Sequence, residues 1–358
     1  MLPPVGIVMA EHGSVRVFPV DKPGSADKAV TIYDVAKAAG VSPSTVSRAF
    51  SRPGRVSART AAHIHEVAAE LGYRVPQVVK TEAARQSKML GISATDITNP
   101  FFFGIIRGAE HVALAEDYSI ILADSQENDE LERRLSDRTM PLVDGMIVAT
   151  SRLPDSFLRN AAKTAPVVSL NRLGPGLPSV ITDNPRGMRR ALEHLAELGH
   201  RRVAYVSGPT NSWADGARGR AFREGCYELD LMDHRVGPTV PTVRGGMGIL
   251  PQIREQHVTA VICFNDVVAV GVMRAAKMAG VQVPHELSVV GIDNVFVADL
   301  VSPGLTTIAS PLTLLGERAA RTVIALANGQ EPETSADRPS VLPMRLIVRE
   351  STGPAPRR

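Results

Sequence analysis

The sequence has few cysteines, few aromatic residues and no long apolar run. Its 358 residues include two cysteines, Cys226 and Cys263, and only 4% of them are Phe, Trp or Tyr. The cysteines lie far apart, and neither has a second Cys or a His at metal-ligand spacing, so we expect small core residues rather than a disulfide or a zinc site. Because no apolar run approaches the roughly 20 residues that span a bilayer, the sequence argues against a membrane protein.

Motifs for catalysis and nucleotide binding are also missing. The glycine-rich segments 208–213 (GPTNSW) and 244–249 (RGGMGI) lack the GxGxxG and GxxxxGK(S/T) spacings that cradle phosphates. No GxSxG motif or activated cysteine supplies a nucleophile. His63 and His65 stand two residues apart on a predicted helix, which points their rings to different faces. We therefore expect neither an enzyme nor a bound cofactor or metal.

Positive charge is concentrated in one segment. The net charge is +3, yet residues 28–88 contain ten Lys and Arg against four Asp and Glu. Such a concentration is typical of a nucleic-acid-binding region. Residues 1–27 mix Pro, Gly and charges without a lasting period and lack the basic start and apolar segment of a secretory signal. We expect a flexible tail there, and a cytoplasmic protein.

Residues 31–50, TIYDVAKAAGVSPSTVSRAF, have the pattern of a helix-turn-helix. Such a motif needs a small residue where its helices cross, a glycine at the left-handed turn and an apolar residue on the second helix that faces the first. Ala36, Gly40 and Val46 occupy these positions. Ser42 is a good N-cap and Pro43 suits the first helical position, so the second helix is predicted to begin at Pro43.

The second helix presents side chains that can reach the major groove, namely Ser44, Thr45, Ser47 and Arg48. Arg48 is the best candidate base reader, through a guanine edge. A third helix is predicted from Ser57 to a stop at Gly72, with an apolar stripe made of Ile64, Val67, Ala68 and Leu71. The alternative is a small helical bundle with a solvated basic face, which would not require the ordered turn and caps.

From Met89 onward, short apolar segments alternate with longer amphipathic ones, as in parallel sheets flanked by helices. Seven strands are predicted, at residues 89–95, 118–123, 145–149, 166–170, 202–206, 258–263 and 287–292. Because seven strands over about 260 residues exceed the usual size of one sheet, we expect two lobes.

Ligands of open α/β sheets bind beyond the carboxyl ends of the strands. A polyol needs paired donors and acceptors together with an apolar face for its C–H groups. Loops and helix starts after the predicted strands offer such side chains: Asp96, Phe102, Asp124, Trp213, Arg218, Phe222, Asn265 and Asp293. Other interpretations stand beside these: Phe102 as core, Trp213 as cover for a surface gap, and Asp266 as the cap of the helix that follows it.

These motifs resemble the lactose-repressor (LacI/GalR) family of transcriptional regulators. The matching segments are residues 31–48, TIYDVAKAAGVSPSTVSR, and 55–73, RVSARTAAHIHEVAAELGY, and the likeness extends over roughly residues 30–350. The resemblance implies that Arg48 contacts bases and that Pro43 and Ser44 vary with the operator. It also implies that phosphates are held by Thr45, Ser47, Ser57 and Thr60. Thr31 and Tyr33 complete the predicted DNA-binding set.

The same resemblance implies a fold that joins an α domain to an α/β domain: a three-helix DNA-binding domain, then a two-lobed sensor like a periplasmic binding protein. Arg218 and Asp293 would be the main ligand-holding residues, and Asn265, Phe102 and Trp213 would line the pocket. We place the DNA-binding domain at residues 28–75, the hinge linker at 76–88, the sensor at 89–350 and a tail at 351–358. Within the sensor, the first lobe is predicted at 89–182 and 309–338, and the second at 183–308 and 339–350.

The linker departs from the family pattern. In the family it carries a leucine that wedges into the minor groove and kinks the DNA, usually after a Tyr-x-Pro-Asn start. This chain has Gln77 after Pro76, and Glu82 and Ala83 stand near the wedge position. Since a glutamate would face a phosphate-rich groove at an electrostatic cost, we expect that this linker does not kink its operator in the usual way.

The observations predict a DNA-binding transcriptional regulator, a repressor or an activator, that responds to a small molecule in its C-terminal domain. A sugar fits the side-chain chemistry first, and a purine or another small molecule stays open. A stand-alone sugar receptor would share the sensor but not the helix-turn-helix. Because two-fold operators need two readers, we expect a homodimer on double-stranded DNA. Residues 351–358, STGPAPRR, have no heptads for a tetramer-forming coiled coil.

Overall fold

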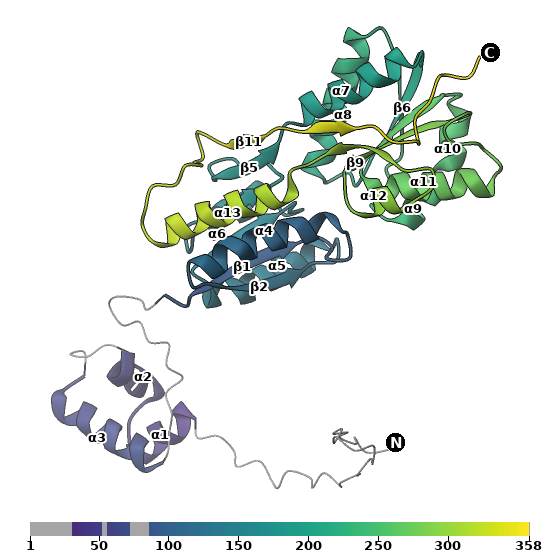
Figure 1. Cartoon of the computed structure of the whole chain (residues 1–358). Helices are drawn as coiled ribbons and strands as arrows, with labels where there is room; N and C mark the ends of the chain where they lie inside the picture. The colour runs from purple at the N-terminus through teal and green to yellow at the C-terminus, as the bar shows by residue number, and fades with distance from the viewer. Residues whose placement is uncertain (1–30, 52–55, 72–85, 358) are drawn as a thin grey trace, which may run out of the picture. The chain divides into compact units, whose positions relative to one another are not determined.

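The computed structural model describes residues 31–51, 56–71 and 86–357. The chain divides into two compact units, residues 1–85 and 86–358, each of which is described by itself (Figure 1). Three sequence predictions fall outside the described residues: the tail at 1–27, the helix stop at Gly72, and the wedge position at Glu82 and Ala83.

The described part of the smaller unit contains three helices, α1 (Ile32–Ala38), α2 (Pro43–Ser51) and α3 (Ala58–Glu70). Gly40 has a φ of +67° in the turn between α1 and α2, a conformation that glycine adopts without steric cost. α2 begins at Pro43, as predicted, and the Ser42 side chain accepts a hydrogen bond from Thr45 N at 3.2 Å. Local sequence signals therefore account for the turn and for the start of α2.

Apolar side chains of the three helices form one core. Val35, Ala36, Val46, Ile64 and Ala68 are all buried in it. Leu71, predicted to extend this stripe, is instead 39% exposed, because α3 ends at Glu70 and Leu71 is its C-cap residue. The core fixes how α1 and α2 cross, and so leaves the polar side of α2 facing outward.

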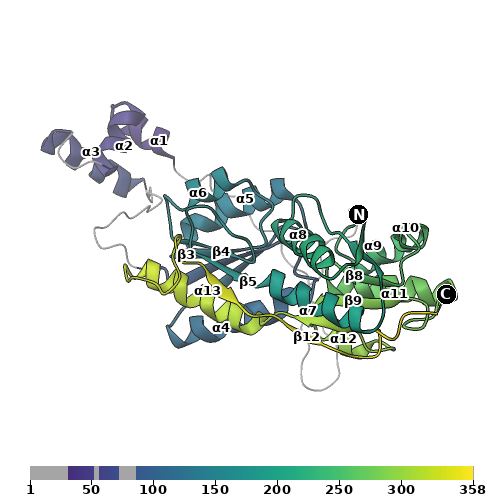
Figure 2. The same ribbon diagram turned by 90° about the horizontal axis from the view of Figure 1, so that it is seen from above.

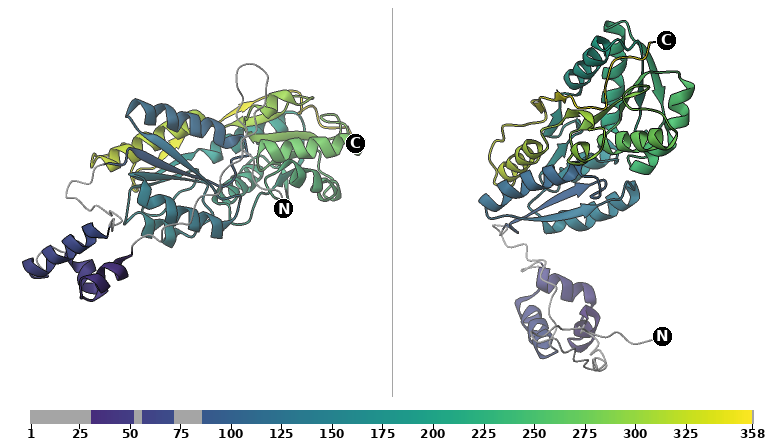
Figure 3. Two further views of the ribbon diagram at one scale, coloured as in Figure 1. Left: turned by 90° about the horizontal axis from the view of Figure 1, so that it is seen from below. Right: turned by 45° about the vertical axis from the view of Figure 1, so that its right-hand side comes forward.

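The described residues of the larger unit form two mainly parallel sheets, and each sheet with its helices makes a lobe (Figure 3). The first lobe has the strand order β11-β5-β4-β3-β1-β2. Its strands are β1 (Met89–Ala94), β2 (Ser119–Asp124), β3 (Gly145–Ala149), β4 (Val167–Leu170), β5 (Ser179–Thr182) and β11 (Ser340–Leu342). Helices α4 (Phe101–Ala115) and α13 (Leu312–Ala327) cover one face, whereas α5 (Asp129–Thr139) and α6 (Asp155–Ala161) lie on the other, with a 3-10 turn at Met140–Leu142 after α5 (Figure 2).

The second lobe repeats this arrangement, with the strand order β12-β10-β9-β8-β6-β7. Its strands are β6 (Arg202–Val206), β7 (Met232–Val236), β8 (Ala260–Cys263), β9 (Ser288–Asp293), β10 (Thr306–Ala309) and β12 (Arg345–Ile347), of which β12 runs antiparallel to β10. Helices α7 (Asn184–Glu197) and α8 (Trp213–Glu228) lie on one face, and α9 (Val243–Gly248), α10 (Leu250–Glu255), α11 (Asp266–Met278) and α12 (Val297–Leu300) on the other (Figure 1).

Side-chain alternation explains why each sheet is covered on both faces. In β6, Val203 and Tyr205 belong to the core under α7 and α8, whereas Ala204 and Val206 belong to the core under α10 and α11. A strand that is apolar at every position has to be buried on both sides. The seven predicted strands all form, with ends within two residues of the prediction, while β5, β7, β10, β11 and β12 are short strands that the sequence does not predict.

The chain passes between the lobes at residues 182–184, 309–312 and 342–345 in the described structure. The predicted boundary after residue 338 is wrong, because β11 pairs with β5 and so keeps residues 340–342 in the first lobe. Ala309 in turn belongs to β10 of the second lobe. The yellow ribbon in Figure 1 follows this last passage from β11 into the second lobe.

Residues 351–355, which belong to the predicted tail, pack on the second lobe. Ser351 is fully buried, and its hydroxyl donates to Val289 O at 2.6 Å. Ala355 N donates to Leu198 O at 2.8 Å. Cys226 and Cys263 are also buried in this lobe, as predicted, and neither forms a disulfide.

Candidate functional site

The outer side of α2 carries a small polar network. Ser44 and Arg48 are exposed, and Arg48 Nη2 donates to Ser44 Oγ at 3.2 Å. Ser42 Oγ lies 2.9 Å from Ser44 Oγ and 2.8 Å from Thr45 Oγ1. Because the buried Val46 anchors α2, these donors and acceptors form a preorganised surface, which suits base edges and phosphates in a major groove.

Further predicted DNA contacts lie at helix starts. Ser57, the N-cap of α3, accepts from Thr60 N at 3.2 Å, and Thr31 donates from its N and Oγ1 to the Asp34 carboxylate. Tyr33 is 70% exposed. Hydroxyl groups and N–H groups at such positions are the usual partners of phosphates. All nine predicted residues are exposed or half-buried: Thr31, Tyr33, Pro43, Ser44, Thr45, Ser47, Arg48, Ser57 and Thr60.

A cleft lies between the two lobes of the larger unit, at the carboxyl ends of the strands. The first lobe lines it with Thr95, Asn99, Phe101, Phe102, Glu127, Thr150, Arg152 and Asn171, and the second with Ser212, Ala214, Arg218, Pro241, Phe264, Asn265 and Asp293. The strand order reverses between β1 and β3 in one sheet and between β6 and β8 in the other. Open α/β sheets bind ligands at such switch points, and this fold directs two of them into one cleft.

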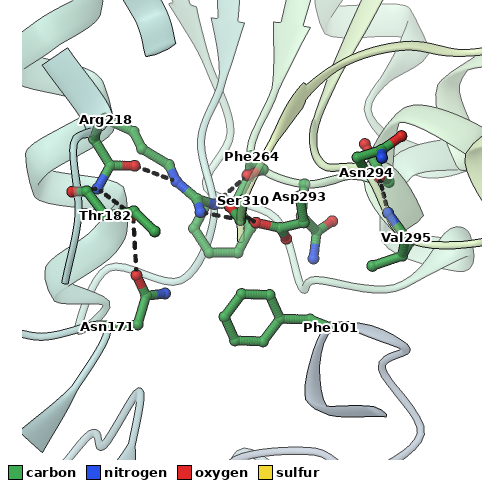
Figure 4. A network of polar contacts seen from close by, with 12 residues as sticks. Phe101, Asn171, Thr182, Arg218, Phe264, Asp293, Asn294, Val295 and Ser310 are labelled. Carbon is green, nitrogen blue, oxygen red and sulfur yellow. Dashed lines mark hydrogen bonds and ion pairs between the residues drawn. The ribbon is translucent and has the colours of Figure 1, made fainter. Parts of the chain in front are cut away.

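Arg218 on α8 organises the second-lobe wall of the cleft (Figure 4). Its Nε donates to Asn184 Oδ1 at 3.1 Å, its Nη1 to Phe264 O at 2.6 Å and its Nη2 to Asp293 Oδ1 at 3.1 Å. The Phe264 ring lies 5.1 Å from the guanidinium carbon. Arg218 and Asp293 are only 2% and 4% exposed. Each guanidinium nitrogen thus has a partner, which fixes the position of the Asp293 carboxylate beside the cleft.

Hydrogen bonds continue from Arg218 across a connecting segment toward the first lobe. Asn184 Nδ2 donates to Thr182 Oγ1 at 3.2 Å, and Thr182 Oγ1 donates to Asn171 Oδ1 at 3.4 Å. Figure 4 shows Asn171 and Phe101 on the first-lobe side, below the Arg218 and Asp293 pair. The cleft is therefore lined by both lobes, next to one of the segments that connect them.

Two buried carboxyl groups share the second-lobe wall. Burial raises the pKa of Asp293 to about 6, although the Arg218 guanidinium beside it acts in the opposite direction. Burial, and then the charge of Asp293, raises the pKa of Asp266 well above its usual range. Asp266 accepts hydrogen bonds from Thr307 Oγ1 at 2.5 Å and Val295 N at 2.8 Å. Because Asp266 favours its neutral form, Asp293 is the carboxyl group of this pair that ionises near neutral pH.

The first-lobe wall carries a second arginine and carboxylate pair. Arg152 donates from Nε and Nη2 to Glu127 at 3.0 and 3.1 Å, and from Nη1 to Thr150 O at 3.2 Å. The side chain of Arg152 is 5% exposed and that of Glu127 is 26% exposed. Thr95 Oγ1 lies 2.9 Å from Thr150 Oγ1. Each lobe thus presents one paired arginine to the cleft.

Backbone strain is concentrated along the cleft. Four lining residues have positive φ angles: Glu127 (56°), Thr150 (57°), Asn171 (54°) and Asp293 (111°). Residues other than glycine adopt this region at a cost of roughly 1–3 kcal/mol each, and such residues cluster at ligand-binding sites. The positive φ angles fix the direction in which these four side chains leave the backbone at the cleft.

Four of the eight predicted ligand residues line the cleft, namely Phe102, Arg218, Asn265 and Asp293. Asp96, Asp124, Trp213 and Phe222 do not belong to the lining. Asp96 accepts hydrogen bonds from its neighbour Thr98, and Asp124 from Ile97 N and Gln126 N, so both carboxylates shape local turns. Phe222 is 1% exposed and packs on Tyr205, and Trp213 is half-buried at the start of α8.

The cap of α11 is Asn265, whose Oδ1 accepts from Val268 N at 2.9 Å. The expectation that Asp266 caps this helix is therefore wrong, because Asp266 points back to β10 and the β9 loop. Sequence reasoning also missed lining residues of the first lobe, among them Asn99, Phe101, Glu127, Arg152 and Asn171. Each follows a first-lobe strand, so a search of every loop after a strand would have found them.

Residues 31–51, 56–71 and 86–357 contain no cluster of three His, Cys, Asp or Glu side chains that could hold a metal ion. None of the helices in these ranges is long and apolar enough to cross a membrane.

A helix-turn-helix unit joined to a two-lobed sensor with an interlobe cleft defines the class of ligand-responsive DNA-binding regulators. Residues 31–76 match the model of the bacterial regulatory proteins of the lacI family, and residues 192–352 match that of the periplasmic binding protein-like domain. The ribose operon repressor of Halalkalibacterium halodurans is 32% identical over 326 residues, which cover 90% of this chain and 97% of that protein.

Solved structures agree with this match. The lac repressor dimer bound to operator and the anti-inducer ONPF has 27% identity and a TM-score of 0.67, over 91% of this chain and 100% of that one. A LacI family regulator from Enterococcus faecalis with bound ribose has 29% identity and a TM-score of 0.66, over 74% of this chain and 99% of that one. The chain belongs to the lacI family of bacterial regulatory proteins, and it is a DNA-binding transcriptional regulator.

Proposed function

We propose that the protein is a repressor whose binding to operator DNA is controlled by a sugar in the cleft between its lobes. The observation that carries this proposal is the cleft itself, where carboxylates, amides and two arginines face Phe101 and Phe102. A polyol requires this combination of hydrogen-bonding groups and apolar faces. The ribose in the Enterococcus faecalis structure supports a sugar as effector.

Operator recognition is assigned to α2. Arg48, with five N–H donors in a planar fork, would read a guanine edge, and Ser44 beside it would contact a neighbouring base or phosphate. Ser57 and Thr60 at the start of α3 would hold the backbone in register. The operator in the lac repressor structure supports this mode of binding.

A homodimer is proposed as the working form, because one helix-turn-helix makes few base contacts. The lac repressor structure contains a dimer, which supports this state. The second lobe offers an apolar groove lined by Val270, Met273 and Val301, near the 74% exposed Leu300. Exposed apolar patches of this kind are typical of protein interfaces.

The switch is a closure of the two lobes around the effector. Arg218 and Asp293 belong to one lobe and Asn171 to the other, so a sugar bound by all three would favour one lobe orientation over another. We infer that the cleft binds its ligand without catalysing a reaction, because the ribose operon repressor, which is similar along nearly its whole length, is a regulator. Operator binding would place the protein in the bacterial cytoplasm.

The test begins with selection of a binding site from random DNA duplexes. Binding of the purified full chain to that site should weaken as salt increases, since phosphate contacts release counterions. A panel of sugars and purines is then screened by thermal shift, with and without the DNA. A stand-alone receptor would bind a sugar but ignore duplex DNA, and that result would contradict the proposal.

A further inference from the structure

We infer that the effector is an uncharged sugar, and that Glu127 excludes phosphorylated sugars by occupying Arg152. This inference rests on the proposed function, because it concerns the ligand of the same cleft. Neither Glu127 nor Arg152 was predicted from the sequence as a ligand contact. The hydrogen bonds of Arg152 and Arg218 and the charges that face the cleft carry the inference.

Neither Arg152 nor Arg218 has a guanidinium group free to bind an anion through two nitrogens. In Arg152, Nε and Nη2 donate to the two Glu127 oxygens, and Nη1 donates to Thr150 O. In Arg218, the three nitrogens donate to Asn184, Phe264 O and Asp293. Both arginine side chains are at most 5% exposed. A phosphate group that approaches either arginine would therefore compete with a carboxylate that is already bound to it.

The charges that line the cleft balance. Its lining contains two basic residues, Arg152 and Arg218, and two acidic residues, Glu127 and Asp293. An incoming phosphate would bring negative charge next to two carboxylates, and like charges at close range repel each other. Sugar hydroxyls instead donate to carboxylate oxygens, which keep lone pairs free while they accept from arginine. The wall therefore favours a neutral hydrogen-bond donor.

The aromatic lining suits a sugar. Rings come from both lobes, with Phe101 and Phe102 from the first and Phe264 from the second. Such apolar faces suit the C–H surfaces of a sugar ring.

The test compares matched sugars with the full-length protein. Ribose, glucose and fructose are titrated beside ribose 5-phosphate, glucose 6-phosphate and fructose 1-phosphate, by calorimetry at constant ionic strength. At least one uncharged sugar should bind, and its phosphate should bind at least about 100-fold more weakly. A phosphorylated sugar that binds the wild type as tightly as its parent overturns the inference but leaves sugar control of DNA binding intact.

Glu127→Gln tests the role of the pair. It keeps the shape of the side chain but removes the charge that neutralises Arg152, so binding of the matched sugar phosphate should strengthen at least about tenfold relative to the parent sugar. Asp155→Asn is the matched control, because Asp155 pairs with Arg172 at 2.5 Å in the same lobe and neither residue lines the cleft. If the affinity for the sugar phosphate relative to the parent sugar is the same in Glu127→Gln as in the wild type, the role of Glu127 is refuted.

If this variant does not fold, the wild-type comparison still decides the charge preference. A response to purines but to no sugar would contradict both this inference and the proposed effector.

Discussion

Arg218 Nη2 donates to Asp293 Oδ1 at 3.1 Å, and this bond joins helix α8 to the end of strand β9 in the wall of the cleft. Both side chains are buried, and Asp293 has the strained φ of 111°. The same arginine reaches Asn184, which stands where the chain has just crossed between the lobes. One pair of residues therefore links the shape of the ligand site to the segment that sets the lobe orientation.

Arg218→Ala should abolish effector binding and destabilise the second lobe. Removing one partner of a buried ion pair leaves an uncompensated charge, at a cost of about 3–5 kcal/mol. Arg218→Lys should not restore binding, because a single ammonium cannot reproduce three hydrogen bonds in a planar fork. Urea unfolding gives the stability and calorimetry with the responding sugar gives the affinity. Wild-type affinity in Arg218→Ala would show that this wall does not hold the ligand.

Effector affinity should fall as the pH falls through about 6, the pKa of Asp293. The ionised carboxylate accepts from Arg218 and from sugar hydroxyls, so only that form binds well. At pH 5 the affinity should be about tenfold lower than at pH 7, since the competent fraction falls in that proportion. Titrations of the wild type at several pH values measure this. Asp124→Asn, outside the cleft, should keep the profile, and a flat wild-type profile would contradict the assignment.

Titration of Asp293 should change folding stability with pH in the direction opposite to its effect on effector affinity. Because the folded protein holds the Asp293 proton more tightly than the unfolded chain does, the contribution of this group to stability is largest at low pH and declines as the pH rises toward about 6. Stability and ligand affinity should therefore move in opposite directions over this range. Comparison of Asp293→Asn with the wild type by urea unfolding isolates the contribution.

Arg48→Ala should weaken operator binding by about 1–3 kcal/mol and relax the base preference at one position of each half-site. The reason is that Arg48 and Ser44 form the exposed surface of α2, while the structure of the helix depends on buried residues such as Val46. Fluorescence anisotropy with the selected operator and its single-base variants measures both effects. Arg223→Ala, an exposed change on α8, is the control. A uniform loss across all operator variants would assign Arg48 to a phosphate rather than to a base.

Gly40→Ala should destabilise the turn by about 1–2 kcal/mol, although the structure leaves space for the added methyl group. The cost comes from the φ of +67°, which alanine adopts poorly. Gly40→Asn should cost less, because asparagine tolerates the left-handed region. Amide exchange in α1 and α2 of the full-length protein compares the variants. Equal protection from amide exchange in the wild type and both variants would show that the turn does not require glycine at position 40.

Local signals explain where sequence reasoning succeeded. The start of α2 at Pro43 and the turn at Gly40 depend on neighbouring residues, and the central strands are apolar at nearly every position. The short strands β11 and β12 carry no such signal. Each has only three residues, too few to show an alternation of apolar and polar side chains, and the strands with which they pair are more than 35 residues away in the sequence. The sequence could not show that the chain crosses between the lobes after Leu342.

The ligand site was predicted in part for a similar reason. Strand ends indicate which loops face the cleft, and Arg218 and Asp293 lie in its lining. Side-chain direction within a loop depends on backbone angles that the sequence does not show. Asp96 turns toward Thr98, whereas Glu127, with a φ of 56°, reaches Arg152 in the cleft. Phe222 is one helical turn beyond Arg218 and faces the sheet instead.

The central claim is that the cleft and the operator-binding unit are energetically linked. The most direct measurement is operator affinity at fixed ionic strength with and without a saturating effector, together with effector affinity with and without operator. Both affinities should change by the same factor, about 5- to 150-fold, which corresponds to a coupling of roughly 1–3 kcal/mol. Operator affinity that stays the same when the cleft is saturated would contradict the account.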